Sequence, residues 1–113
     1  MFSAVFEQAG EPRLATLAQL DVSALGKLAP DVLVCDVDDY ASDSLELLRQ
    51  IRFVLPVCMI AVYTGVMTRP WGRACHLAGA NCLLAKESTE RQLSHGLRDA
   101  LLSGCYTDPR FAA

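Results

Sequence analysis

The sequence lacks a strong excess of charge of either sign, because its 113 residues include 10 Lys and Arg against 13 Asp and Glu, for a formal net charge of −3. Proteins bind DNA or RNA largely through basic side chains that neutralise phosphates, so we expect no direct nucleic-acid binding by this chain. A long apolar run is missing as well. The longest stretch without a charged residue, residues 53–68, contains Pro56 and Gly65 and is shorter than the about 20 apolar residues of a membrane-spanning helix. No basic segment precedes the apolar residues at the N-terminus, so we predict a cytoplasmic protein with no membrane partner.

Cysteine pairs and glycine-rich loops are also missing. The five cysteines form no CxxC pair, and His76 and His95 stand 19 positions apart in separate predicted helices. We therefore expect reduced cysteines in an apolar core and no histidine-based metal site. No glycine-rich phosphate loop follows any predicted strand, which disfavours a flavodoxin-like or other α/β enzyme. We do not expect an enzyme in the ordinary sense.

Apolar residues are abundant, at 52% of the chain against 20% charged, which indicates one globular domain over residues 1–113. Three runs predict strands, residues 31–37, 57–63 and 81–85, and the first two are apolar at nearly every position. Strands that are buried on both faces show this pattern, as in parallel sheets covered by helices.

Helical segments alternate with these strands, over residues 44–55, over residues 70–78 and in the stretch before Gly104. The last helix is expected to bury Leu93, Leu97, Ala100 and Leu101 on one face. Each helix has boundary signals, namely Asp43 and Pro56 for the first, Thr68 and Gly79 for the second, and a Thr89–Gln92 capping box with Gly104 for the last. Strands that alternate with helices predict an α/β fold, a parallel sheet with helices on both faces.

The first 30 residues allow two interpretations. Residues 2–7 predict a strand, but residues 11–28 fit either a single long helix opened by Pro12 or a second strand over residues 13–20 followed by a short helix capped by Asp21. In the second interpretation the short turn over residues 8–12 would force a hairpin or an exchange of strands between two chains.

Polar residues fall where the predicted strands end. These are Glu7, Asp36, Thr64 and Lys86. In open α/β sheets the ligand site lies outside the carboxyl ends of the strands. A carboxylate nucleophile, a second acid for a cation, a hydroxyl and an ammonium group together suit phosphoryl transfer to a carboxylate.

From about residue 29 to residue 110 the sequence resembles a response-regulator receiver domain, the CheY-like (flavodoxin-like) module of two-component signalling. PDVLVCDVDD resembles the third strand of that family with the phosphoacceptor at Asp36, AVYT places the hydroxyl residue at Thr64, and AGANCLLAKES places the lysine at Lys86. The tail LRDALLSGCYTDPRF is similar to the branch whose output is a LuxR-type helix-turn-helix. Four motifs in order are a specific signal for the fold.

The sequence departs from the family pattern in three places. Receivers carry a pair of acidic residues after the first strand, and Glu7 with Gln8 is the nearest match here. Asp36 lies closer to the N-terminus than the pattern leads us to expect, so one helix and possibly one strand are predicted to be missing. Leu83 stands where the family often has an aromatic residue.

The resemblance implies a function. Asp36 would accept a phosphoryl group from a sensor histidine kinase, Glu7, Asp36 and Asp38 would bind Mg²⁺, and Thr64 and Lys86 would hold the product. Asp38 and Asp39 could partly replace the missing acid, or be loop residues in water. The domain would then control dimerisation or the DNA-binding output of a longer chain.

An alternative is a pseudo-receiver, a protein-interaction or dimerisation module that phosphorylation does not control. The shortened N-terminus would leave an edge or a face of the sheet exposed. We therefore predict a homodimer.

Overall fold

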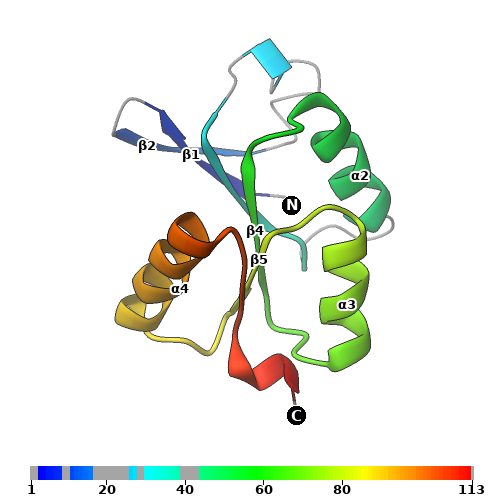
Figure 1. Ribbon diagram of the computed structural model, residues 1–113, viewed down its shortest axis with the longest axis vertical. Coiled ribbons are helices and arrows are strands. Elements are labelled where there is room, and N and C mark those ends of the chain that lie inside the picture. The colour runs from blue at the N-terminus through cyan, green and yellow to red at the C-terminus, as the bar shows by residue number, and fades with distance from the viewer. Residues whose placement is uncertain (1–2, 9–10, 17–25, 28–29, 39–43, 113) are drawn as a thin grey trace.

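The computed structural model describes residues 3–8, 11–16, 26–27, 30–38 and 44–112. It contains one six-stranded sheet in the order β2-β1-β3-β4-β5-β6 (Figure 1). In chain order the strands are β1 (Ser3–Gln8), β2 (Glu11–Thr16), β3 (Val32–Asp36), β4 (Met59–Thr64), β5 (Cys82–Ala85) and β6 (Tyr106–Thr107), and the helices are α2 (Ser44–Val54), α3 (Arg69–Leu77), α4 (Glu90–Ser103) and the 3₁₀ helix η1 (Pro109–Ala112). None of the described helices is long and apolar enough to cross a membrane.

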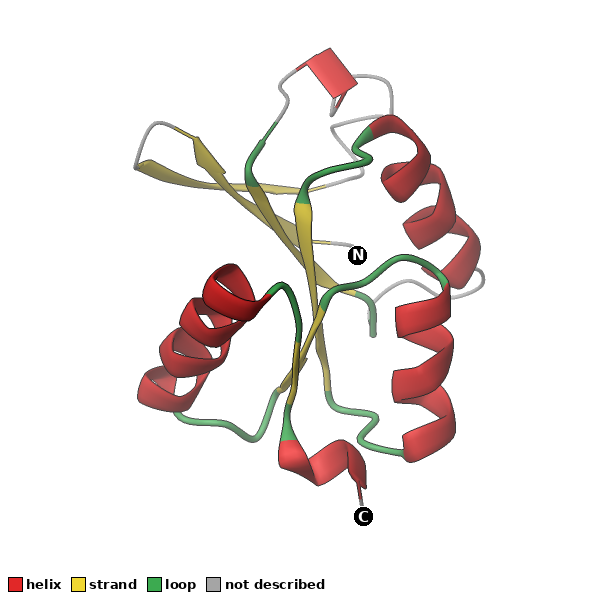
Figure 2. Ribbon diagram, viewed as in Figure 1, coloured by secondary structure: helices red, strands yellow, loops and turns green. Residues whose placement is uncertain are grey.

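Strands β3 to β6 are parallel, and helices cover both faces of the sheet (Figure 2). On one face, α2, α3 and η1 pack over the larger part of the core, which includes Leu33, Ile51 and Leu83. On the other face, α4 packs Ala100 against Ala61 and Leu84. The predicted α/β fold with helices on both faces is confirmed.

The helix boundaries follow local signals in the sequence. Thr68 caps α3 and accepts a hydrogen bond from the Trp71 backbone N–H. Both hydrogen bonds of the capping box at Thr89 form, and α4 ends at Gly104, whose φ of +92° favours glycine. The predicted ends of these helices are confirmed. Asp43, the predicted cap of α2, lies outside the described residues.

Four of the five cysteines lie in the core, as expected. Cys35, Cys58, Cys75 and Cys82 are buried and unpaired, whereas Cys105 is exposed. Burial raises the pKa of the Cys82 thiol to about 12, so this thiol is a weak nucleophile at neutral pH.

The N-terminal strands form a hairpin. β1 pairs with β2 in antiparallel register, with Gln8 opposite Glu11, so the strand-containing interpretation of this region is the closer one, although β2 begins and ends earlier than residues 13–20. The predicted loss of a strand is wrong, because both strands are present. A helix between them is indeed missing, since only two residues separate β1 from β2. Asp21 lies outside the described residues.

β1 also runs antiparallel to β3, which the all-parallel prediction missed. Ser3 stands opposite Asp36, and Glu7 stands opposite Val32. Neighbouring antiparallel strands place the end of one beside the start of the other. Glu7 therefore lies at the end of the sheet away from Asp36.

The last residues add a short strand and a 3₁₀ helix that the sequence did not predict. β6 pairs with the edge of β5, and η1 places Phe111, which is 2% exposed, in the same core cluster as Leu83. The predicted inward face of the last helix is wrong at one position, since Leu101 is 55% exposed.

Candidate functional site

The candidate site lies at the carboxyl ends of the three central parallel strands. Asp36 is the last residue of β3, Thr64 is the last residue of β4, and Lys86 directly follows β5. The Lys86 backbone N–H donates to the Thr64 carbonyl at 2.9 Å and so fixes the end of β5 against β4. The structure thus brings together Asp36, Thr64 and Lys86, as the pattern of strand ends predicts, and adds Asp38 to them.

Lys86 contacts both carboxylates. Its Nζ lies 2.9 Å from Oδ1 of Asp36 and 3.3 Å from Oδ2 of Asp38, and 5.7 Å from the centre of the Tyr63 ring. Burial lowers the pKa of Lys86, but its hydrogen bonds and charge interactions with the two carboxylates outweigh burial and raise the pKa above the usual value. The ammonium group therefore stays charged at neutral pH.

Asp38 accepts hydrogen bonds from more groups than Lys86 alone. The Thr64 hydroxyl donates to Oδ1 at 2.5 Å, and the Gly65 backbone N–H donates to Oδ2 at 2.6 Å. Burial alone would raise the pKa of Asp38, but the bonds from Thr64, Gly65 and Lys86 outweigh it and lower the pKa below the usual value. Asp38 is therefore an ionised, tightly bound carboxylate.

The Thr64 hydroxyl has a fixed orientation. Thr64 is 0% exposed, and its Oγ1 accepts hydrogen bonds from the Val66 N–H at 3.0 Å and from Trp71 Nε1 at 3.3 Å. A hydroxyl has two acceptor lone pairs and one proton, so its proton remains for Asp38. Trp71 lies in the first turn of α3 and thus links the site to that helix.

Asp36 is placed by the turn that follows β3. The Asp38 backbone N–H donates to Oδ1 of Asp36 at 3.2 Å, an Asx-type turn that aspartate favours. The Asp36 side chain is 20% exposed. It is therefore accessible to a reagent while one of its oxygens is held.

Glu7 does not belong to this site, which corrects the predicted ligand set. The antiparallel pairing of β1 puts it opposite Val32 at the far end of β3. Apolar patterning locates a strand but does not give its direction. Asp39 lies outside the described residues.

Two of the three Mg²⁺ ligands that the resemblance implied, Glu7 and Asp38, do not fit a metal site with Asp36. Mg²⁺ would need carboxylate oxygens free to face it, but both oxygens of Asp38 face hydrogen-bond donors. Within the part of the chain that is described, no group of three or more His, Cys, Asp or Glu side chains is placed to hold a metal ion.

Sequence patterns do not predict two groups of the site, the Gly65 amide and the Trp71 indole. The Thr64–Gly65 turn and the position of Trp71 three residues after the Thr68 cap were the available signals. Neither pattern shows that an indole N–H reaches back to the end of β4.

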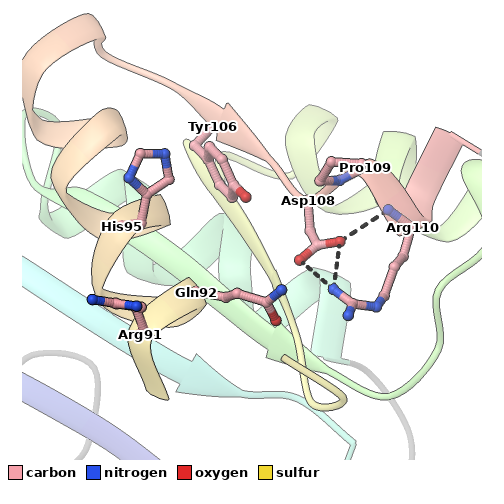
Figure 3. A pocket seen from close by; sticks show the side chains of 7 residues that line it. All are labelled: Arg91, Gln92, His95, Tyr106, Asp108, Pro109 and Arg110. Carbon is pink, nitrogen blue, oxygen red and sulfur yellow. Dashed lines mark hydrogen bonds and ion pairs between the residues drawn. The ribbon is translucent and has the colours of Figure 1, made fainter. Parts of the chain in front are cut away.

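A pocket of about 850 Å³ lies away from this site, between α4 and the segment formed by β6 and η1 (Figure 3). On its wall Asp108, which is 3% exposed, accepts hydrogen bonds from the Arg110 backbone at 2.9 Å and from its guanidinium at 3.1 Å. Ser88 Oγ donates to the same carboxylate at 2.9 Å. The hydrogen bond between Ser88 and Asp108 links the loop after β5 to the C-terminal segment, which is a structural role.

No model of a known protein family matches the chain, and a search of curated proteins finds no match. Solved structures do match. One is a two-component response regulator of the LuxR family from Aurantimonas sp. SI85-9A1, with a TM-score of 0.67 and 22% identity over 80% of this chain. The chain spans 64% of the length of that structure. At this identity the likeness shows the fold, and it confirms the predicted CheY-like α/β class.

Proposed function

We propose that the protein is a receiver-type module of two-component signalling that accepts a phosphoryl group on Asp36. The observation that carries the proposal is the position of Asp36, an accessible carboxylate at the end of a central parallel strand, 2.9 Å from the Lys86 ammonium. The fold shared with a response regulator supports it. A sensor histidine kinase is the proposed phosphoryl donor.

The proposed transfer is a displacement at phosphorus. A carboxylate oxygen of Asp36 forms a bond to the phosphorus of a phosphohistidine while the phosphorus–nitrogen bond breaks. The histidine nitrogen leaves with the electron pair of that bond and takes a proton from solvent. Lys86 stabilises the negative charge on the phosphoryl oxygens, which is the main demand of such a reaction.

The site is hydrogen-bonded to helix α3, which we propose transmits a change at the site to the surface of the protein. Trp71 Nε1 contacts the Thr64 hydroxyl at 3.3 Å and belongs to α3. Leu83, which stands in the place of the usual aromatic residue, is 1% exposed. We propose that the Trp71 side chain, rather than Leu83, changes position when the Thr64 hydroxyl bonds to a different group. We also propose that α3 transmits this change to a dimerisation surface or to a DNA-binding domain.

Phosphorylation is tested by the intact mass of the protein after incubation with acetyl phosphate, with and without Mg²⁺. The wild type gains one phosphoryl group and Asp36→Asn gains none. Asp31→Asn is the matched control, because Asp31 is exposed and directly precedes the start of β3, at the end away from Asp36, and it should leave the adduct unchanged. A folded wild type without an adduct, or an adduct that persists in Asp36→Asn, contradicts the proposal.

The second candidate is a phosphorylation-independent pseudo-receiver that acts through protein interactions. Two observations favour it. Glu7 lies at the opposite end of the sheet from Asp36, and the Thr64 hydroxyl donates its hydrogen bond to Asp38. Under this candidate, Asp36→Asn leaves the partner affinity and the oligomeric state of the protein unchanged.

A further inference from the structure

We propose that the Asp38 carboxylate is a built-in anion, held in an anion-binding site formed by the Thr64 hydroxyl, the Gly65 amide and the Lys86 ammonium group. An external phosphate, or a phosphoryl group on Asp36, gains these donors only when Asp38 releases them. The anion site itself stands on the contacts below, and only the consequence for Asp36 rests on the proposed function.

The first support is the geometry of the donors. They come from the ends of two strands, β4 and β5, and meet at a carboxylate that follows a third strand. Each Asp38 oxygen is engaged: Oδ1 by Thr64 at 2.5 Å, and Oδ2 by Gly65 at 2.6 Å and by Lys86 at 3.3 Å. A hydroxyl, a backbone N–H and an ammonium group are the donor types that proteins use to bind phosphate oxygens.

The second support is that the donors are fixed by contacts that do not involve Asp38. Thr64 is fully buried, and its hydroxyl oxygen is held by the Val66 N–H and by Trp71 Nε1. Lys86 keeps its contact with Asp36 and its backbone bond to Thr64. Removing the Asp38 carboxylate should therefore leave an open, preformed site for a small anion.

The third support is that the site is crowded. A Cβ atom added at Gly65 would lie 3.3 Å from Oδ2 of Asp38 and 3.8 Å from Cδ of Lys86. A tetrahedral anion and the Asp38 carboxylate would compete for the same donors and would also repel each other. Asp38 therefore acts as a competitor of the phosphoryl group.

The test is a titration of Asp38→Ala with inorganic phosphate, followed by the NMR shift of the Gly65 amide. We expect a saturable shift in the variant. The phosphate affinity of the wild type should be at least about tenfold weaker, because phosphate must compete with Asp38 there for charge-assisted hydrogen bonds. Asp31→Ala is the control and should behave as the wild type. Adding Lys86→Ala to Asp38→Ala should abolish the shift.

Equal phosphate affinity in Asp38→Ala and the wild type overturns the inference. If Asp38→Ala does not fold, Asp38→Asn replaces it, because the amide oxygen still accepts from Thr64 while the negative charge is gone. Phosphate should then raise the melting temperature of Asp38→Asn more than that of the wild type. An equal rise in both proteins overturns the inference as well.

Phosphorylation by acetyl phosphate separates this inference from the proposed function. Phosphate binding by Asp38→Ala without an Asp36 adduct in any variant supports the built-in anion and contradicts the phosphoacceptor. An Asp36 adduct in the wild type, together with no phosphate binding by Asp38→Ala, contradicts the built-in anion and leaves the phosphoacceptor in place. Phosphate binding by Asp38→Ala and faster adduct formation than in the wild type support both.

Discussion

At the scale of single residues, the site is dominated by competition for hydrogen-bond donors. Asp36 and Asp38 share the Lys86 ammonium, but only Asp38 also receives the Thr64 hydroxyl and the Gly65 N–H. A carboxylate that accepts several such bonds is strongly favoured in its ionised form. The Lys86 ammonium is therefore shared by both carboxylates, whereas Asp38 alone binds the Thr64 hydroxyl and the Gly65 N–H.

Sequence reasoning located three of these residues because each ends or follows a strand. The sequence pattern predicts Asp38 only as a metal ligand or as a loop residue in water. Asp38 and Thr64 are 26 positions apart, and no spacing rule joins a loop carboxylate to a hydroxyl at that distance along the chain. Glu7 was misplaced because alternation of apolar residues gives no strand direction.

A second carboxylate, Asp108, gives a prediction on stability. Its oxygens accept from Ser88 Oγ and from the backbone and side chain of Arg110. Burial would raise its pKa, but these bonds and the guanidinium charge outweigh it and lower the pKa of Asp108 below the usual value. Asp108→Ala should therefore reduce the free energy of unfolding by about 1–3 kcal/mol at pH 7.

The sign of the pH dependence follows from the lowered pKa. Stability from Asp108 is fully present above the pKa of an unfolded Asp, about 3.9, and is lost as the pH falls through the lower folded value. Urea unfolding between pH 7 and pH 3 should show the wild type and Asp108→Ala converging at acid pH. Asp31→Ala, an exposed control, should lie close to the wild type throughout, and a constant Asp108 difference at every pH would refute this account.

At the scale of elements, the sheet positions the site and local signals position the helices. Thr68, the Thr89 capping box and Gly104 act within one or two turns of chain, so the sequence predicts these boundaries well. β6 and η1 were not predicted because they are only 2 and 4 residues long. They are stabilised largely by contacts with β5, α3 and α4.

Arg52 joins three elements at the end of the sheet opposite the site. Its guanidinium donates to the carbonyls of Gly79 at 2.7 Å and Cys58 at 2.9 Å, and to the side chain of Asn81 at 2.5 Å. Asn81 Oδ1 also accepts from the Ile60 N–H at 3.0 Å. These contacts link the end of α2, the start of β4 and the turn before β5.

Arg52→Ala should therefore destabilise the protein by about 2–3 kcal/mol, because it leaves partly buried carbonyls without donors. Arg52→Lys should recover only part of this, since a lysine cannot reproduce the planar fork. Arg49→Ala is the matched control on the same helix, because its ion pair with Glu46 is exposed and should contribute less than about 1 kcal/mol. Denaturant unfolding distinguishes them, and equal losses for Arg52→Ala and Arg49→Ala would contradict the assignment.

At the scale of the whole molecule, the fold is a CheY-like α/β sheet with an antiparallel hairpin at its N-terminal edge. The strand order ends in a hairpin whose outer strand is β2, and β2 contains Pro12, a residue that strands tolerate mainly at sheet edges. At the opposite edge, the C-terminal segment adds the short strand β6 beside β5. One edge of the sheet is therefore a six-residue strand that contains a proline, and the other is a strand of only two residues.

An edge strand is a template for pairing with another chain, so the predicted homodimer remains our expectation for the whole molecule. Light scattering at micromolar concentration should give twice the mass of one chain. Asp36→Asn should dimerise as the wild type does if the module acts without phosphorylation. A monomer at this concentration would count against the dimer.

The central claim is that Asp36 is the phosphoacceptor, and its most direct test is to locate the modified residue. Borohydride reduces an aspartyl phosphate to homoserine, which peptide mass spectrometry assigns to one position. After acetyl phosphate treatment, the account predicts homoserine at position 36 in the wild type and in Asp31→Asn, and none in Asp36→Asn. Homoserine at another aspartate, or at no position in a folded protein, would contradict it.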